Sequence, residues 1–482
     1  MTRDVVVIGY GMAGARVAEE IRRRDPAGAR VSLTVIGAET YPAYNRVLLS
    51  GVVAGTMRPE SVWLHDNEWA KENDVDLRLG TAVARIDRTA RRIELADGST
   101  VDYDTLVLAT GAKPWLPPVE GLTTDNGEPS PGVVPFRTLA DCERIIDAAN
   151  IGAPVAVLGG GLLGLEAARG LAGRGNLVTV VHPVGHLMER QLDPEGGRVL
   201  AETLRGLGIE FKLGATAARY LPGDGLKLDD GSYVQADLVV VSAGVRADVA
   251  LAREAGLAVD RGVLVDDSLR TSDGRVFAIG DCAQHPGTVS GLVQPAWEQA
   301  AVVADLVTGE NTATRYRGTP VVTRLKARGV DLAAFGDTEF DAAAGAEVLS
   351  VSDSSRGRYA KLLVREEKVA GAIVLGLPDA AANLTQLYDR GARLPEDKLA
   401  LLLGRALPGP GEAAAPSVNP ANLPATAVVC RCNSVTKGRL VEQWRAGATD
   451  VPALAAATRA TTGCGGCADA VRGIAGWLAE TS

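Results

Sequence analysis

Features that would assign the chain to several other classes are missing from its 482 residues. Lysine and arginine number 50 against 59 aspartates and glutamates, and the resulting charge of −9 argues against a nucleic-acid-binding protein. No run of 18 or more apolar residues occurs, so we expect no membrane span. The chain does not start with a basic region followed by an apolar stretch and a cleavage site. We therefore expect no signal peptide, and we predict a cytoplasmic location.

Cysteine is also scarce, with six in the whole chain. In a reducing compartment, cysteines bind metals or act in catalysis more often than they form disulfides. Cys142 and Cys282 are isolated in the sequence, and we interpret each as a buried structural thiol. The other four are gathered near the C-terminus.

Two glycine-rich turns, each between an expected strand and an expected helix, dominate the first part of the chain. The first follows a strand at 4–8, opens a helix at 12–24 and precedes a strand at 31–36. The second follows a strand at 155–158, opens a helix at 162–172 and precedes a strand at 177–181. Their glycines are Gly9, Gly11 and Gly14, then Gly159, Gly161 and Gly164.

Each turn has the spacing G-x-G-x-x-G. The first glycine permits a tight turn, the second lets the backbone approach a pyrophosphate, and the third lets the helix pack on the strand. The helix N-terminus then offers free N–H groups to the phosphates. Within strand–helix–strand units this pattern predicts two dinucleotide sites, and the alternative is a purely structural turn.

Three further segments carry a family resemblance. Residues 103–111, 243–244 and 275–281 each end an expected strand in small residues or an acid. They resemble the pyridine-nucleotide-disulfide oxidoreductase superfamily, flavoproteins with two stacked Rossmann-type domains. The resemblance implies FAD at the first turn and NAD(P)H at the second. It also implies FAD contacts at Ala109, Thr110, Gly111, Gly280 and Asp281, and an NAD(P)H contact at Gly244. For Asp281, a helix N-cap is the alternative.

The residue that holds the ribose normally ends the second strand of such a unit and is acidic. In the FAD unit Glu39 is the candidate, and the alternative is a solvent-facing acid. In the NAD(P)H unit His182 stands at this place. Because a neutral histidine does not strongly reject a 2′-phosphate, NADH and NADPH both stay open. Arg190 lies nearby, and we interpret it as a solvated charge on a helix.

The stretch 44–50 resembles the flavin-side helix of rubredoxin-reductase-like enzymes and of the nitrite reductase large subunit. This implies that Arg46 lies beside the flavin, and the alternative is a surface charge. Residues 291–299, with Pro295, should begin a helix whose N-terminus faces the isoalloxazine and favours its anionic reduced form. Residues 40–55 contain no cysteine. The thiol chemistry of disulfide reductases is therefore excluded, and electrons must leave the flavin by another route.

The C-terminal cysteines are spaced as Cys430-x-Cys432 and Cys464-x2-Cys467. Four thiolates are the number that a [2Fe–2S] cluster requires. A four-thiolate zinc site is the alternative, although the single residue between Cys430 and Cys432 disfavours it. The arrangement resembles the bacterioferritin-associated-ferredoxin-like (BFD-like) [2Fe–2S] domain. Helices are expected from about Asp450 and over 467–478.

We predict an α/β fold built from two Rossmann-type domains, a small α+β domain and a small helical [2Fe–2S] domain. The predicted parts are an FAD-binding domain (1–115 and 245–313), an NAD(P)H-binding domain (116–244), a rubredoxin-reductase-like C-terminal α+β domain (314–407), a linker (408–426) and a BFD-like domain (427–482).

The resemblance implies an NAD(P)H-dependent FAD/[2Fe–2S] electron-transfer oxidoreductase with a redox partner, an assimilatory nitrate or nitrite reductase catalytic subunit. The 2 cysteines outside the C-terminal cluster are too few for a [4Fe–4S] sirohaem site, so we expect no nitrite reduction by this chain alone. The alternatives are a stand-alone rubredoxin or ferredoxin reductase and a zinc-stabilised binding module without turnover. Because cofactors carry such chemistry, we expect no essential acid or base among the side chains.

Overall fold

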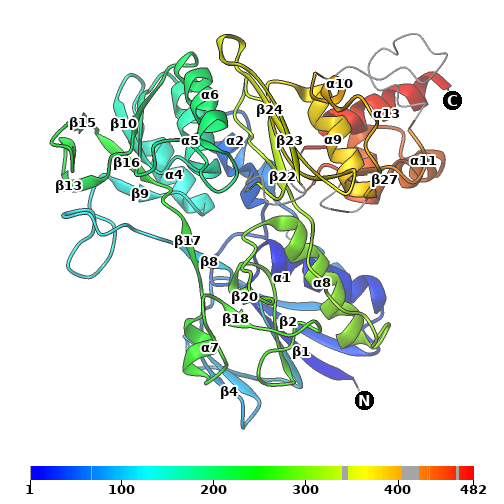
Figure 1. The fold of residues 1–482 in the computed structure, drawn as a ribbon. Coiled ribbons are helices and arrows are strands. Elements are labelled where there is room, and N and C mark those ends of the chain that lie inside the picture. Colours follow the sequence, from blue (N-terminus) through cyan, green and yellow to red (C-terminus); the bar gives the residue numbers. More distant parts are fainter. Residues whose placement is uncertain are drawn as a thin grey trace.

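The computed structural model describes residues 2–66, 68–338, 346–403, 423–430, 433, 435–462 and 466–481. Two five-stranded parallel sheets with flanking helices, a five-stranded antiparallel sheet and a small C-terminal group of helices dominate this part of the chain, and smaller sheets accompany them (Figure 1). None of the helices in these ranges has both the length and the apolar character that crossing a bilayer requires.

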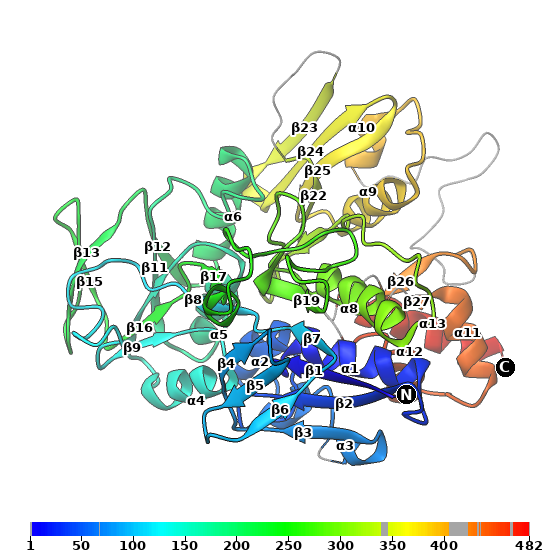
Figure 2. The same cartoon turned by 90° about the horizontal axis from the view of Figure 1, so that it is seen from below.

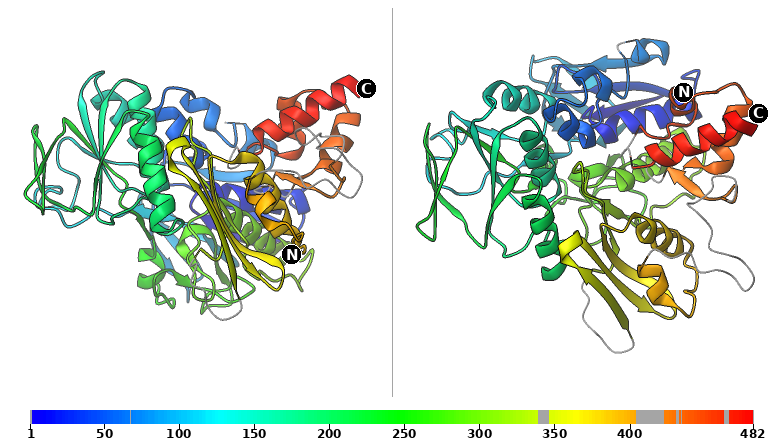
Figure 3. Two further views of the ribbon diagram at one scale, coloured as in Figure 1. Left: turned by 45° about the horizontal axis from the view of Figure 1, so that its top comes forward. Right: turned by 90° about the horizontal axis from the view of Figure 1, so that it is seen from above.

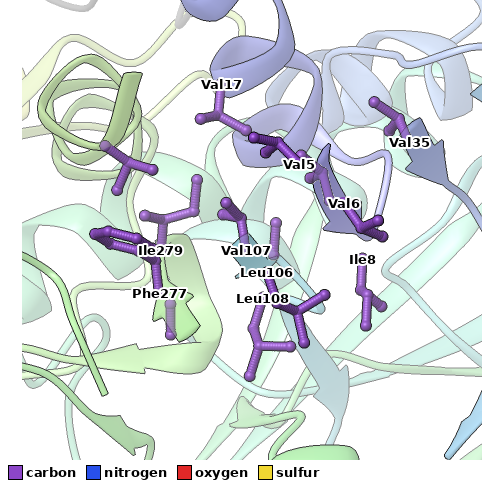
Figure 4. Close-up of a cluster of buried hydrophobic side chains, with 14 of the residues drawn as sticks. Val5, Val6, Ile8, Val17, Val35, Leu106, Val107, Leu108, Phe277 and Ile279 are labelled. Carbon is purple, nitrogen blue, oxygen red and sulfur yellow. The ribbon is translucent and has the colours of Figure 1, made fainter. Parts of the chain in front are cut away.

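The first sheet is parallel and has the strand order β19-β7-β1-β2-β3. Its strands are β1 (Arg3–Ile8), β2 (Val31–Ile36), β3 (Val75–Arg78), β7 (Thr105–Leu108) and β19 (Val276–Ala278). A strand that is covered on both faces is apolar along its whole length, which explains why residues 5–8 are all apolar. Helices α1 (Met12–Arg24) and α8 (Val293–Thr308) pack together beside this sheet, and Val17 of α1 lies over Val5 (Figure 4).

Shorter elements complete the first unit. They are β4 (Val83–Asp87), β5 (Arg92–Leu95), β6 (Thr100–Asp102), β18 (Val263–Leu264), β20 (Ala283–Gln284), α2 (Leu49–Val53), α3 (Trp69–Glu72), α7 (Ala250–Glu254), and the 3-10 turns η1 (Arg46–Leu48), η2 (Pro59–Val62) and η3 (Gly280–Cys282). The pair β8 (Ala112–Pro114) and β17 (Val245–Ala247) joins this unit to the next.

The second sheet is also parallel, with the order β12-β11-β10-β16-β9. Its strands are β9 (Val133–Pro135), β10 (Pro154–Leu158), β11 (Leu177–His182), β12 (Ile209–Leu213) and β16 (Leu238–Val241). The helices α4 (Leu139–Ala148), α5 (Leu162–Gly173) and α6 (Pro194–Arg205) accompany it, with a small antiparallel sheet of β13 (Ala217–Leu221), β14 (Gly225–Leu228) and β15 (Tyr233–Gln235). The strand–helix–strand pattern predicted for both units is confirmed.

The third sheet is antiparallel and has the order β21-β22-β25-β24-β23. Its strands are β21 (Val322–Arg324), β22 (Leu332–Gly336), β23 (Glu347–Asp353), β24 (Arg358–Arg365) and β25 (Lys368–Leu375), followed by α9 (Pro378–Arg390) and α10 (Lys398–Leu402). The turn η4 (Ser354–Arg356) joins β23 to β24. Tyr359 and Lys361 of β24 bond Asp193, the N-cap of α6, at 2.6 and 2.7 Å, and so hold this sheet on the second unit.

The tail, residues 423–481 as described, contains β26 (Val428–Cys430), β27 (Val435–Thr436), α11 (Lys437–Arg445), α12 (Val451–Thr458) and α13 (Ala468–Thr481). Asp450 caps α12 by accepting the N–H of Ala453 at 2.7 Å, which confirms the predicted helix start. The tail lies beside α1 and α8 (Figures 2 and 3). Of the predicted linker, 408–422 falls outside the described residues, and the five-part division of the chain stays a prediction.

Candidate functional site

The first glycine-rich turn joins β1 to α1 and has the geometry that its spacing predicts. Gly9 has φ +106°, a value that L side chains rarely adopt. A Cβ at Gly14 would lie 1.8 Å from the Gly9 carbonyl oxygen, so only glycine allows this approach of helix to strand. At Gly11 a Cβ would lie 3.9 Å from the Arg46 side chain, an ordinary contact distance, so no backbone or side chain crowds this position.

The second turn, between β10 and α5, repeats this arrangement. Gly159 has φ +120°, and a Cβ at Gly164 would lie 2.2 Å from the Gly159 oxygen. A Cβ at Gly161 or Gly244 would meet no described atom within 4 Å. Both turns therefore leave room at the helix N-terminus for a group that approaches the backbone closely, as a pyrophosphate does.

A cavity of about 740 Å³ opens at the first turn and continues to the tail. This volume is within the range of small-molecule and cofactor sites. Nine of the predicted FAD residues line it, together with two tail cysteines: Gly9, Gly11, Glu39, Arg46, Ala109, Thr110, Gly111, Gly280, Asp281, Cys430 and Cys467. Gly14 and Pro295 are not in the lining. Leu162, Leu163 and Glu166 bring the start of α5 to the same cavity.

Arg46 and Glu39 form an ion pair in the cavity wall. Tyr44 donates its hydroxyl to the second Glu39 oxygen at 2.6 Å, and its ring lies 5.0 Å from the Arg46 guanidinium carbon. Burial by itself would lower the pKa of Arg46, but Tyr44, Glu39 and Asp281 raise it above the usual value. Arg46 thus presents a fixed positive charge to the cavity, with its side chain 23% exposed.

Asp281 pairs with Arg137, which the sequence pattern did not indicate. Their side chains meet at 2.6 Å and are less than one-fifth exposed. Asp281 lies inside η3 and does not cap it, since Ile279 is the N-cap residue. The neighbouring Gly280 donates its N–H to Gln299 of α8 at 2.8 Å. Arg137 comes from the segment before α4, a different unit, so no local motif could have connected it with Asp281.

Glu166 of α5 is a second residue whose environment only the fold reveals. It accepts the hydroxyl of Ser50 at 3.0 Å and the backbone N–H of Lys326 at 3.0 Å. Burial raises the pKa of this carboxyl, and the Lys326 charge acts in the opposite direction. Three segments distant in sequence therefore meet at one wall of the cavity.

His182 ends β11, as predicted, and its ring lies beneath the second glycine-rich turn. Its Nδ1 accepts the N–H of Gly160 at 3.2 Å, and its Nε2 lies 3.1 Å from a Glu189 oxygen. Burial lowers the pKa of His182, while Glu189 opposes this shift. Arg190 is exposed in a turn, so the prediction that it lies on a helix is wrong.

Cys430 and Cys467 are 2% and 7% exposed, and both line the cavity. The backbone N–H of Thr461 donates to the Cys467 sulfur at 3.2 Å, and the Asn433 amide lies 3.7 Å from the Cys430 sulfur. The hydrogen bond with Cys467 lowers the pKa of Cys430 to about 6. Two neighbouring cysteine sulfurs, one of which has a lowered pKa, suit a metal centre. The other two predicted ligands, Cys432 and Cys464, lie outside the described residues.

The isolated cysteines have the buried environments that the sequence suggested. Cys142 and Cys282 are both fully buried. Burial raises the pKa of Cys142 to about 12 and also raises that of Cys282. Such thiols are unreactive at neutral pH, and neither lies in the cavity lining.

Two stacked dinucleotide-binding units with a shared cavity define a nucleotide-dependent oxidoreductase fold. Residues 3–300 match the family described as pyridine nucleotide-disulphide oxidoreductase, residues 321–391 the rubredoxin NAD+ reductase C-terminal domain, and residues 428–476 the BFD-like [2Fe-2S] binding domain. The chain belongs to the pyridine nucleotide-disulphide oxidoreductase family. This membership implies FAD and NAD(P)H, the tail match implies a [2Fe–2S] cluster, and the glycine turns and tail thiols fit these groups.

Two curated relatives from Bacillus subtilis (strain 168) align over nearly the whole chain. One is a nitrite reductase [NAD(P)H], 34% identical over 98% of this chain and 57% of its own length. The other is an assimilatory nitrate reductase electron transfer subunit, 32% identical over 99% of this chain and 60% of its own length. The chain thus spans less than two thirds of either relative.

Among solved structures, the ferredoxin reductase for the CYP199A2 system from Rhodopseudomonas palustris is similar. It superposes with a TM-score of 0.71 and 27% identity, covering 82% of this chain and 96% of its own.

Proposed function

We propose that this chain is an NAD(P)H-dependent electron-transfer flavoprotein that passes electrons through its tail to a partner reductase. One observation carries the proposal. The same cavity is lined by the glycines of the first dinucleotide turn and by two cysteines of the tail. A flavin bound at that turn and a metal held by those thiolates would share one cavity.

When bound, FAD would supply hydride acceptance from NAD(P)H, and a [2Fe–2S] cluster would supply one-electron transfer. The chain's own residues bind and orient these groups. Gly9, Gly11 and the α1 N-terminus would receive the FAD pyrophosphate, and Gly159 and Gly161 that of NAD(P)H. Arg46, held by Glu39, would present positive charge to the flavin as negative charge develops on it.

In the tail, Cys430 and Cys467 would provide two of the four thiolates, with Cys432 and Cys464 as the others. The N–H of Thr461 and the amide of Asn433 lie at hydrogen-bonding distance from the two described sulfurs. Hydrogen bonds to cluster sulfurs stabilise negative charge and raise the reduction potential. These two donors would therefore favour arrival of an electron from the flavin.

The partner proposed is the catalytic subunit of an assimilatory nitrate or nitrite reductase. Support comes from the relative described as an assimilatory nitrate reductase electron transfer subunit, which aligns with 99% of this chain. We also propose a cytoplasmic location, where thiolate ligands remain reduced.

Replacing Cys467 with Ser tests the tail's role. In the variant, NADH should still bleach the flavin absorbance under anaerobic conditions, but iron content and reduction of a nitrate reductase should collapse. The matched control is Cys142→Ser, which removes a buried thiol that lies outside the tail and does not itself line the cavity. Unchanged partner reduction by Cys467→Ser would refute the proposal, and zinc without iron in the wild-type protein would support the zinc-stabilised module instead.

A stand-alone rubredoxin or ferredoxin reductase is the second candidate. Residues 321–391 match the rubredoxin NAD+ reductase C-terminal domain, and the solved relative is a ferredoxin reductase. Steady-state turnover separates the two. Rapid reduction of rubredoxin or ferredoxin, with no reduction of nitrate reductase, would favour this candidate.

A further inference from the structure

The tail packs on a surface that α1 and α8 form together. Trp297 of α8 is buried there and donates its indole N–H to the Met12 carbonyl oxygen at 3.1 Å. These two residues belong to one apolar cluster with Cys430 and Cys467. The tail cysteines therefore pack against the first turn of the helix that begins at the FAD-type glycine turn.

Two arginines, one from each side of this contact, flank Trp297. The guanidinium carbon of Arg16, on α1, lies 5.2 Å from the ring centroid, and that of Arg459, in the tail, lies 6.0 Å from it. Burial lowers the pKa of Arg16, and repulsion from Arg459 lowers it further. Two like charges at a buried contact are stable only with a counter-charge.

Glu19 of α1 supplies the counter-charge for Arg459, while Arg16 pairs more closely with Glu20, at 2.9 Å. The Glu19 carboxylate pairs with Arg459, lies 3.6 Å from Arg16 Nη1 and lies 2.5 Å from His65 Nε2. The Tyr10 hydroxyl oxygen lies 2.5 Å from Nδ1 of His65 and so fixes the orientation of the imidazole ring. The Glu19 side chain is only 11% exposed, so solvent screens these interactions weakly. Burial alone would raise the Glu19 pKa, but His65, Arg459 and Arg16 lower it and keep the carboxylate ionised.

A second connection joins the same tail segment to the cavity wall. The Asn45 side chain donates to the carbonyl oxygen of Thr462 at 2.7 Å, and its amide oxygen caps η1 by accepting the Val47 N–H at 3.0 Å. Asn45 directly precedes Arg46 of the cavity. Tail residues 459–462 are therefore tied both to α1 and to the wall beside Arg46.

The segment that carries Arg459 also contacts the sulfurs. Asn433, whose amide lies near the Cys430 sulfur, donates to the Arg459 carbonyl oxygen at 2.6 Å. Thr461, two residues after Arg459, donates its N–H to the Cys467 sulfur. Both contacts are made by the backbone of this segment, so a displacement of that backbone away from Glu19 would also displace the sulfurs relative to the cavity.

We propose that Glu19 and Arg459 are positioning residues, whose ion pair holds the tail cysteines against the FAD cavity in the arrangement through which electrons pass. The inference rests on the proposed function. Electron tunnelling weakens steeply with distance, so a small separation of the tail from the cavity slows it. In this docked arrangement the tail receives electrons without a change of its position relative to the cavity.

Glu19→Gln tests the pair, because it removes the charge and keeps the shape. The holoprotein is mixed with NADH anaerobically, flavin absorbance is followed by stopped flow, and the cluster's paramagnetic signal is followed by freeze-quench. We expect flavin reduction at the wild-type rate and cluster reduction slowed about tenfold or more, since breaking a buried ion pair shifts docking strongly. A merely structural role would lower iron or flavin content and leave the transfer rate of intact molecules unchanged.

Arg459→Ala should reproduce the slow transfer, and Arg459→Lys, which keeps the charge, should recover part of the rate. The matched control is Arg472→Ala, which removes an arginine of the same tail that pairs with Asp469 at the surface and is 67% exposed. Its transfer rate should equal that of the wild type.

Wild-type cluster reduction in Glu19→Gln, with full flavin and iron, would overturn the inference. If Arg459→Ala loses iron, the cluster reduction rate of Glu19→Gln decides whether the inference holds, because residue 19 lies outside the tail. Failure of the proposed function has a different signature: in the wild-type holoprotein NADH would reduce the flavin while the cluster stayed oxidised.

Discussion

A single methyl group should have different effects at two glycines of the same turn, Gly161 and Gly164. Gly164 faces the strand, and its Cβ would lie 2.2 Å from the Gly159 oxygen and 3.2 Å from the Gly159 carbonyl carbon. Real Cβ contacts are not shorter than about 3 Å, so Gly164→Ala must push α5 away from β10. Overpacking of this kind costs about 1–3 kcal/mol and sometimes more.

Gly161→Ala meets no described atom within 4 Å, and its φ of −84° is open to alanine. The loss of unfolded-state entropy favours alanine by about 0.4–1 kcal/mol, and the poorer N-cap opposes it by about the same amount, so stability should change little. The methyl group would instead occupy the space where a pyrophosphate approaches the backbone. We expect NADH to bind roughly fivefold to a hundredfold more weakly, if relieving that clash costs about 1–3 kcal/mol.

Two measurements separate these effects. Thermal or urea unfolding should show a loss of stability in Gly164→Ala and almost none in Gly161→Ala. Anaerobic flavin reduction over a range of NADH concentrations should show the weaker binding in Gly161→Ala, with the limiting rate preserved. A stable Gly164→Ala, or a Gly161→Ala with wild-type NADH dependence, would refute this account of the turn.

Two further predictions concern buried charges. Asp281→Asn removes the counter-charge of Arg137. It should weaken FAD retention about tenfold to a hundredfold, if a hydrogen bond to a charged group contributes about 1.5–3 kcal/mol. Flavin-to-protein ratios after dialysis measure this, and full retention would contradict it. Asp193→Asn should lower stability at pH 7, because Lys361 and Tyr359 hold the pKa of Asp193 below its usual value, against the effect of burial. A carboxylate with a depressed folded-state pKa contributes its full stabilisation above the unfolded pKa of about 3.9, and this stabilisation is lost as the pH falls through the folded-state pKa. The stabilities of the two proteins should therefore converge in acid. A constant difference in unfolding midpoint between pH 7 and pH 3 would contradict this.

The sequence by itself determined the glycine turns of the two nucleotide-binding units and the strand–helix–strand elements around them. Helix α1 was predicted at residues 12–24, where it is found, and β2 at 31–36. These features are local: apolar runs identify buried strands, and glycine is needed wherever φ is positive or a helix packs closely on a strand. The tail helices α12 and α13 followed from equally local signals, such as the Asp450 cap, but α11 was not predicted.

Only the tertiary structure decided which side chains face one another across segments. Arg137 meets Asp281, the Lys326 backbone meets Glu166, and Arg459 meets Glu19. No spacing along the chain encodes these pairs, because each joins residues more than a hundred positions apart. Their proximity arises when separately folded units bury apolar surface against one another, and the charges carried to those contacts then require partners.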